Sequence, residues 1–127
     1  MRVILYNSGL GPKIPTGQKT STIRCKARCK PGDELSHRVW TGKPYRSPQQ
    51  EIHRSICKAV RAVSMELIPA GHLVISIDGH DLGPQRELAL AKQEGFDCIA
   101  DLKAYFIKSA ELSCDSQPFE GEMIEWE

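Results

Sequence analysis

The feature that most constrains the fold is a series of short runs in which apolar and polar residues alternate, separated by segments rich in glycine and proline. Alternation with a period of two predicts β-strands, and the intervening glycines and prolines predict turns. The runs cover residues 1–7, 19–26, 35–42, 72–77 and 119–126. A clear helical pattern, with start and stop signals, appears after residue 84. This order predicts an α+β domain, a small β-barrel with helices inserted late in the chain.

Two helices are predicted after residue 84. Pro84 suits the first position of a helix, and Gly95 is expected to end it. Asp97 is expected to cap the start of the second helix. The apolar residues expected to face the core are Leu88, Leu90 and Ala91 in the first helix and Ile99, Leu102, Phe106 and Ile107 in the second.

Residues 51–67 fit two periods. Their apolar positions form a helical stripe that includes Ile52, Ile56 and Val63, while residues 56–64 also alternate as a strand does. Periodicity alone leaves both structures open. The β-rich run at residues 72–77 favours two strands joined by a short connection.

At 127 residues the chain has the size of one compact domain, and we expect a single domain over residues 1–127. No apolar run approaches the ~20 residues that a bilayer span needs, so a membrane protein is not expected. The first seven residues hold one positive charge and a short apolar run, which is too little for a secretion signal. We expect a cytoplasmic protein.

The five cysteines cannot all pair within the chain, and a core of this size has little need of disulfides. We therefore expect reduced thiols. Cys25, Cys29 and His37 raise the question of a zinc site, but structural zinc normally has a second close pair of ligands, and none is visible. Neither a metal nor another cofactor is expected.

The formal net charge of +1 hides a strong polarity along the chain. Residues 1–61 hold 13 basic and three acidic residues, a balance of +10, and the remainder is −9. Clustered lysine and arginine attract polyanions through phosphate contacts and counterion release, so nucleic acid is the first partner to consider. The alternative is that the two halves interleave and neutralise each other as ordinary surface ion pairs.

The most informative string is GQKTSTIR, at residues 17–24. A glycine opens it, and a lysine, three hydroxyls and an arginine follow, which is a composition typical of anion binding. Lys19 and Thr22 lie on opposite faces of a regular strand, yet a twisted strand entrance brings both towards one cleft. The alternative is an exposed polar strand without a site.

This string resembles the G-x-K-x-x-T-I-R hallmark of the ASCH family, small β-barrel proteins related to the PUA RNA-binding domain. Other segments are similar to elements of that family, in the same order. They are a turn and strand at residues 31–35, a central strand at 57–63, a helix end at 91–96 and a final strand at 119–126. The resemblance spans nearly the whole chain. It implies a PUA-like barrel and a strand, not a helix, at residues 51–67.

The resemblance also implies a cleft between the barrel and the helices that binds RNA or a modified nucleoside. Some small family members are similar to amidohydrolases that deacylate N(4)-acetylcytidine, and the matching catalytic residues here are Lys19, Thr22 and Glu94. A lysine with a lowered pKa takes the proton from a threonine hydroxyl, and a carboxylate orients the pair. The alternative for Glu94 is a solvated position at a helix end. The expected substrate or RNA contacts are Gly17, Thr20, Arg24, Lys26, Arg28, Trp40 and Tyr45.

Three hypotheses stay open. The basic half favours a domain that binds RNA or a nucleoside, the three matched residues favour an amidohydrolase, and the acidic half favours a protein-interaction module. The basic segment at residues 26–54 fits RNA better than a lone nucleoside, because rings such as Trp40 and Tyr45 stack on unpaired bases while cations hold phosphates. Trp40 is equally a candidate core residue.

Overall fold

The computed structural model describes residues 1–7, 9–67, 73–108 and 119–126. Its strands are β1 (Arg2–Tyr6), β2 (Ser21–Arg24), β3 (Glu34–Trp40), β4 (Gln49–Leu67), β5 (Leu73–Ile77), β6 (His80–Asp81) and β7 (Phe119–Trp126). A short 3-10 turn, η1 (Gly11–Lys13), follows β1. The helices α1 (Pro84–Gln93) and α2 (Ile99–Lys108) lie between β6 and β7 in the sequence. The predicted α+β class, with helices late in the chain, is confirmed.

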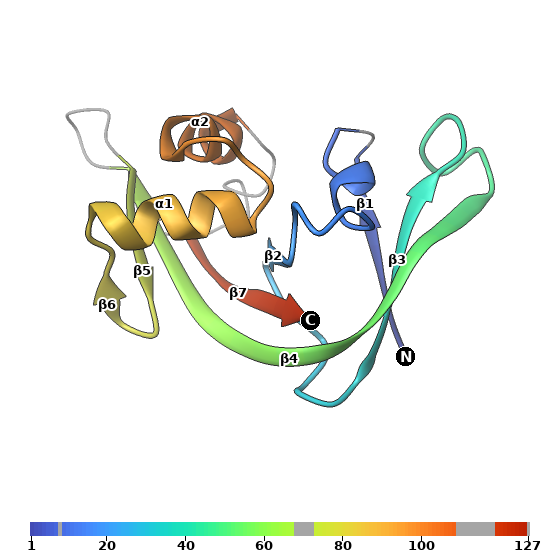
Figure 1. Cartoon of the computed structure of the whole chain (residues 1–127), viewed down its shortest axis with the longest axis horizontal. Coiled ribbons are helices and arrows are strands. Elements are labelled where there is room, and N and C mark those ends of the chain that lie inside the picture. Colours follow the sequence, from blue (N-terminus) through green and yellow to red (C-terminus); the bar gives the residue numbers. More distant parts are fainter. Residues whose placement is uncertain (8, 68–72, 109–118, 127) are drawn as a thin grey trace.

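The strands form one curled, mixed sheet (Figure 1). Its main path runs β1-β3-β4-β5-β6, and β7 pairs with both β2 and β4. Strands β1 and β3 are parallel, and the other pairs are antiparallel. The long strand β4 pairs with β3 through its first part and with β7 and β5 through its second. Because one strand belongs to both parts, the sheet curves into a half-barrel.

Two irregularities in the pairing accompany this curvature. The register of β3 and β4 shifts between His37 and Arg38, and that of β4 and β7 shifts between Cys57 and Ala59. A β-bulge bends its strand and increases the local twist. The second shift falls where β4 passes from one set of partners to the other.

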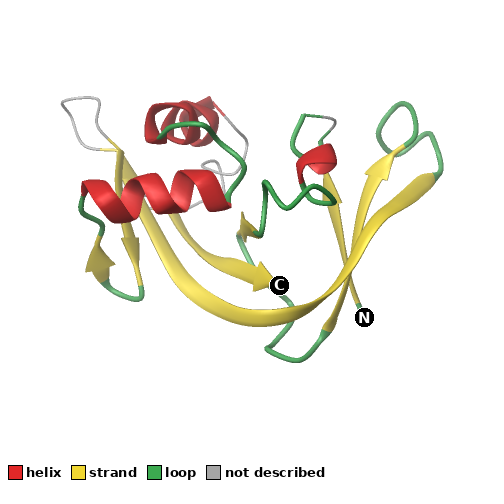
Figure 2. Ribbon diagram, viewed as in Figure 1, coloured by secondary structure: helices red, strands yellow, loops and turns green. Residues whose placement is uncertain are grey.

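Helices α1 and α2 lie over one part of the curled sheet and leave the β1–β3 part uncovered by either helix (Figure 2). The apolar side chains form two clusters. The larger cluster joins the helices to the sheet and holds Ile23, Val63, Met65, Leu73, Ile75, Ile77, Leu90, Ala91, Leu102, Phe106 and Met123. The smaller holds Ile4, Tyr6, Ile14, Ala27, Leu35, Cys57, Ile124 and Trp126. Strands β2 and β7 supply residues to one or both clusters, so the segment at residues 17–24 lies close to the junction between them.

The predicted elements agree with most of the structure. Residues 51–67 are a strand, and α1 begins at Pro84 as expected. The expected cap of the second helix is wrong, because α2 begins at Ile99 and Cys98, not Asp97, immediately precedes its first turn. Leu88 is exposed, whereas the core positions Leu102 and Phe106 are buried; the side chain of Ile107 and residue 72 lie outside the described set. No helix in the described part of the chain is both long and apolar enough to cross a bilayer.

Candidate functional site

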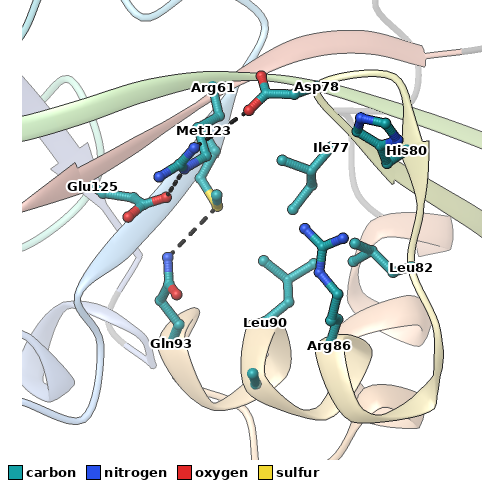
Figure 3. Close-up of a pocket in the computed structure, with 11 residues that line it drawn as sticks. Arg61, Ile77, Asp78, His80, Leu82, Arg86, Leu90, Gln93, Met123 and Glu125 are labelled. Carbon is teal, nitrogen blue, oxygen red and sulfur yellow. Dashed lines mark hydrogen bonds and ion pairs between the residues drawn. The ribbon is translucent and has the colours of Figure 1, made fainter.

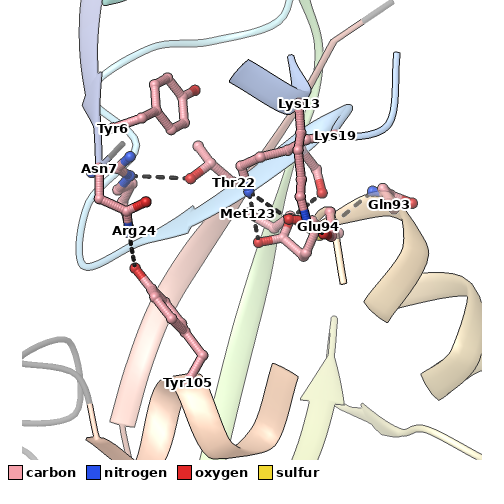
Figure 4. Close-up of polar contacts among 12 residues, drawn as sticks. Tyr6, Asn7, Lys13, Lys19, Thr22, Arg24, Gln93, Glu94, Tyr105 and Met123 are labelled. Carbon is pink, nitrogen blue, oxygen red and sulfur yellow. Dashed lines mark hydrogen bonds and ion pairs between the residues drawn. The ribbon is translucent and has the colours of Figure 1, made fainter. Parts of the chain in front are cut away.

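Four buried polar side chains belong to the segment leading into β2, to β2 itself and to the end of α1, which lie side by side (Figure 4). The exposed fraction is 2% for Lys19 and Glu94, 4% for Thr22 and 0% for Ser21. Burial of such groups is costly unless each finds a partner. Within the described residues, no buried side-chain nitrogen or oxygen lacks a hydrogen bond.

Three of these side chains meet, because Lys19 and Ser21 both contact Glu94. The Lys19 ammonium donates to the main-chain oxygen of Glu94 at 2.9 Å and lies 3.7 Å from its carboxylate Oε1. The other carboxylate oxygen accepts a hydrogen bond from the Ser21 hydroxyl. Glu94 is therefore not a solvated residue at a helix end. Ser21, which was not among the predicted site residues, holds its carboxylate.

The end of α1 places these groups. The last carbonyls of a helix lack partners within it, and cations suit its negative end. Here the oxygen of Gln93 accepts from the Thr20 amide at 2.8 Å, that of Glu94 accepts from Lys19, and that of Gly95 accepts from the Lys13 ammonium at 2.6 Å. The segment before β2 thus caps the helix. One of the two capping lysines, Lys19, is the predicted base.

Burial lowers the pKa of Lys19. The carboxylate of Glu94 acts against this shift, and the positive charge of Arg24 adds to it. A neutral lysine amine accepts a proton, whereas an ammonium does not. The direction of the shift is therefore the one that a general base requires.

Thr22 and Arg24 line a cavity of about 230 Å³, together with Tyr6, Asn7 and Tyr105. We call this cavity the cleft; it lies between β1, β2 and α2 (Figure 4). The Arg24 guanidinium donates to the Thr22 hydroxyl at 3.2 Å and to the main-chain oxygen of Leu5 at 2.8 Å, and it lies 5.1 Å from the centre of the Tyr6 ring. Arg24 is held in place on three sides.

The predicted base and the predicted nucleophile do not contact each other directly. Among the described side chains, Lys19 bonds to Glu94 and the Thr22 hydroxyl bonds to Arg24. The Lys19 ammonium lies 6.0 Å from the centre of the Tyr6 ring, and Tyr6 and Thr22 line the same cleft. Lys19 thus lies behind the wall of the cleft and Thr22 lies in the wall.

A second buried network supports the cleft. The Tyr6 hydroxyl lies 2.9 Å from Nδ1 of His37, and Nε2 of His37 lies 2.8 Å from the Ser55 hydroxyl. Burial raises the pKa of Tyr6 above its ordinary value and lowers that of His37 to about 4. Tyr6 therefore keeps its proton and His37 is neutral, so one ring nitrogen of His37 donates a hydrogen bond and the other accepts one. The sequence offered no signal for this network, because its members come from three different strands.

The remaining predicted contacts do not line the cleft. Gly17 is exposed, and Thr20 takes part through its main chain. Lys26 and Arg28 are exposed in the segment after β2. Trp40 ends β3, and Tyr45 lies in the loop between β3 and β4.

A separate hollow of about 400 Å³ lies between α1 and strands β4, β5 and β7 (Figure 3). Its floor is apolar and includes Leu90 and Met123. On its rim the Arg61 guanidinium donates to Glu125 at 2.7 Å and to Asp78 at 3.3 Å. None of the predicted site residues lines this hollow.

The cysteines differ from the expected state in one respect. Cys29, Cys57 and Cys98 carry free thiols, but Cys25 is disulfide-bonded, so the expectation of five reduced thiols is wrong for Cys25. Residue 114 lies outside the described set. Within the described residues, no three histidine, cysteine or acidic side chains come together as metal ligands, and His37 is occupied by Tyr6 and Ser55.

Comparisons of the chain with protein-family models, with curated proteins and with solved structures return no match.

Proposed function

We propose that the chain is an ASCH-type, PUA-like domain that binds RNA or a modified nucleoside in the cleft. The observation that carries the proposal is the composition of the cleft: two tyrosines, the Arg24 guanidinium and the Thr22 hydroxyl around about 230 Å³. An aromatic lining suits contact with an unpaired base, and an arginine offers a fork of donors for a phosphate or a base edge.

The size of the cleft supports a base-sized ligand group. Pockets for drug-sized molecules usually measure about 300–1,000 Å³, so the cleft is smaller than most of them. A nucleobase fits this scale better than a whole nucleotide. The sugar and the phosphates of a bound strand would then lie outside the cleft.

The family proposal is supported by the arrangement of the matching residues. Within the string at residues 17–24, Thr22 and Arg24 face the cleft, and Lys19 contacts Glu94 from the helix end that also matches the family. Lys19 and Glu94 contact each other although 75 positions separate them in the sequence. A half-barrel sheet with two helices late in the chain is also the coarse architecture that such a domain needs.

A second candidate function is deacylation of N(4)-acetylcytidine, and the buried Lys19 favours it. A threonine hydroxyl is a weak nucleophile until a base removes its proton. Lys19 has the lowered pKa of such a base, and Glu94 contacts its ammonium. Because Lys19 and Thr22 do not contact each other, this reaction requires the Lys19 amine to reach the Thr22 hydroxyl through a bridging water or a change of side-chain conformation when substrate fills the cleft.

In this reaction the Thr22 hydroxyl oxygen bonds to the acetyl carbonyl carbon, and Lys19 takes the hydroxyl proton. The bond from that carbon to N4 of the cytosine then breaks, the proton passes to N4, and cytidine leaves. A water molecule hydrolyses the acetyl ester on Thr22, releases acetate and restores the hydroxyl. Glu94 orients Lys19 in both halves of the reaction.

The binding proposal is tested by calorimetry with cytidine, N(4)-acetylcytidine and other modified nucleosides. Arg24→Gln removes a charged donor from the cleft and should weaken binding about 10-fold or more. Arg86→Gln changes an exposed arginine outside the cleft and should leave binding unchanged. Absence of binding to every nucleoside, or equal binding by Arg24→Gln, would contradict the proposal and leave the protein-interaction hypothesis.

The enzymatic candidate is tested by chromatography of the same mixtures for cytidine and acetate. Thr22→Val keeps the shape of the side chain and should abolish release, whereas Thr22→Ser keeps the hydroxyl and should retain it. Because Lys19 acts when neutral, the rate should rise with pH as its amine deprotonates. A wild-type protein that binds N(4)-acetylcytidine without releasing acetate has the binding function alone.

A further inference from the structure

The end of the β3–β4 hairpin is strongly basic. Residues 38–50 contain Arg38, Lys43 and Arg46 and no acidic residue. Lys43 and Arg46 are exposed, and neither pairs with a carboxylate among the described residues. The loop lies at the end of the sheet away from α1 and α2 (Figure 1), so it is separate from the hollow beside α1.

An aromatic pair lies within this basic loop. The rings of Trp40 and Tyr45 are 5.2 Å apart and tilted by 47°. Trp40 is half-buried, whereas Tyr45 is 87% exposed, the most exposed of the large apolar or aromatic side chains described. Trp40 therefore supports Tyr45 from one side, and the rest of the Tyr45 ring faces solvent.

The loop holds Tyr45 in a strained backbone conformation. Its φ is +65°, a value that bulky residues rarely adopt and that costs of order 1 kcal/mol. Hydrogen bonds across the loop maintain this shape: the Thr41 amide and hydroxyl both donate to the oxygen of Pro48, and the Gly42 amide donates to the Ser47 hydroxyl, which donates to the oxygen of Lys43. The loop is ordered by its own bonds, and no bond of the Tyr45 side chain is needed for it.

A solvent-facing ring on a loop shaped in advance, between two unpaired cations, is suited to a single-stranded polyanion that carries planar bases. A membrane surface would require several apolar side chains beside the cations. Among residues 41–48 Tyr45 is the one aromatic residue, the other apolar side chains are the short rings of Pro44 and Pro48, and there is no valine, leucine, isoleucine or methionine to insert into a bilayer.

We propose that the hairpin end docks a single-stranded nucleic acid, with an unpaired base stacked on Tyr45 and phosphates held by Lys43 and Arg46. This inference builds on the proposed function, because it makes a strand, not a free nucleoside, the ligand that the whole domain binds. The hairpin contacts the strand outside the cleft, and the cleft takes one base.

The test measures fluorescence anisotropy of labelled eight-nucleotide RNA and DNA strands with wild-type protein and Tyr45 variants. Tyr45→Gly removes the ring and suits the positive φ, so it should fold at least as well as wild type and yet bind about fivefold or more weakly. Tyr45→Phe keeps the ring and should bind as wild type does. Comparison of the RNA and DNA strands shows which of the two nucleic acids the hairpin binds more tightly.

The two proposals fail separately. Equal binding by wild type and Tyr45→Gly, or no binding of either strand by wild type, overturns the hairpin proposal. Calorimetry with a free nucleoside tests the cleft alone, and Tyr45→Gly should leave that binding unchanged. A protein that binds strands through Tyr45 but no nucleoside supports the hairpin proposal and contradicts the cleft.

Discussion

His37 is an uncharged histidine enclosed in the core. Its two nitrogens bond to Tyr6 and Ser55, and its ring lies 4.3 Å from that of Trp126 and 5.6 Å from that of His53, between ring centres. Its exposed fraction is 0%. Burial, with the neighbouring His53, opposes the charged form. Because Tyr6 forms part of the cleft wall, His37 fixes a residue of the site without touching a ligand.

This environment predicts a specific loss of stability in acid. The pKa of His37 is about 4 in the folded protein and near 6.5 when unfolded, so the unfolded chain alone takes up a proton between these values. The free energy of unfolding should therefore fall as the pH falls from 6.5 to 4, by on the order of 3 kcal/mol from this residue.

The measurement is urea unfolding of wild type and His37→Gln at several pH values from 7 to 4. Glutamine keeps a donor and an acceptor but does not titrate in this range, so its stability should fall less steeply. The difference between the two slopes removes the contribution of all other groups. Equal slopes would show that His37 does not resist protonation in the fold.

For single residues of the site, the sequence identifies the residue types but not their partners. The string at residues 17–24 singles out Lys19, Thr22 and Arg24, and the family resemblance adds Glu94. The carboxylate partner Ser21 and the wall residue Tyr6 carry no comparable pattern. Their roles arise from strand pairing and from contacts across 31 or more positions, which a local pattern does not encode.

Strand β4 shows why the spacing of apolar residues does not always distinguish a strand from a helix. A bulge between Cys57 and Ala59 interrupts its alternation, and the two parts of the strand pack against different partners. Ile56, which fits the helical stripe, is 53% exposed. By contrast, β5 pairs with β4 over its whole length without a bulge, and its alternate residues are buried, so its sequence pattern predicts a strand.

The end of α1 depends on Gly95, whose φ is +96°. A Cβ at this position would lie 3.3 Å from Cβ of Lys19 and 3.4 Å from Cδ of Lys13. The glycine therefore serves two purposes: it allows the left-handed turn that ends the helix, and it allows both lysines to approach the last carbonyls.

Replacing Gly95 by alanine should cost more than the same change at Gly17. Both glycines have positive φ, but a Cβ on Gly17 would meet no atom within 4 Å. Gly17→Ala should lower the free energy of unfolding by about 1 kcal/mol through backbone strain alone, and Gly95→Ala by about 2 kcal/mol. Thermal and urea unfolding of the two variants measure the difference. An equal fall in the free energy of unfolding in both variants would mean that the Lys19 side chain moves away from the added methyl group without cost.

Across the whole molecule, the charges of the two halves neutralise each other only in part. Lys19 pairs with Glu94, and Arg61 pairs with Asp78 and Glu125. Arg54 pairs with carboxylates of its own half. Among the described residues, no other basic side chain of residues 1–61 forms an ion pair. This surplus of positive charge in residues 1–61 favours a polyanionic partner over internal neutralisation.

Binding of a single strand should therefore depend steeply on salt. Each phosphate neutralised on a single strand contributes about −0.7 to the slope of log affinity against log salt concentration. Contact with about four phosphates gives a slope near −3, a loss of roughly 50-fold between 50 and 200 mM salt. Anisotropy titrations over this range measure the slope.

Arg46→Gln should make the slope shallower by about 0.7, whereas Arg86→Gln, at an exposed arginine of the acidic half, should not change it. An affinity independent of salt would mean that the basic surplus does not hold phosphates, even if Tyr45 stacks on a base.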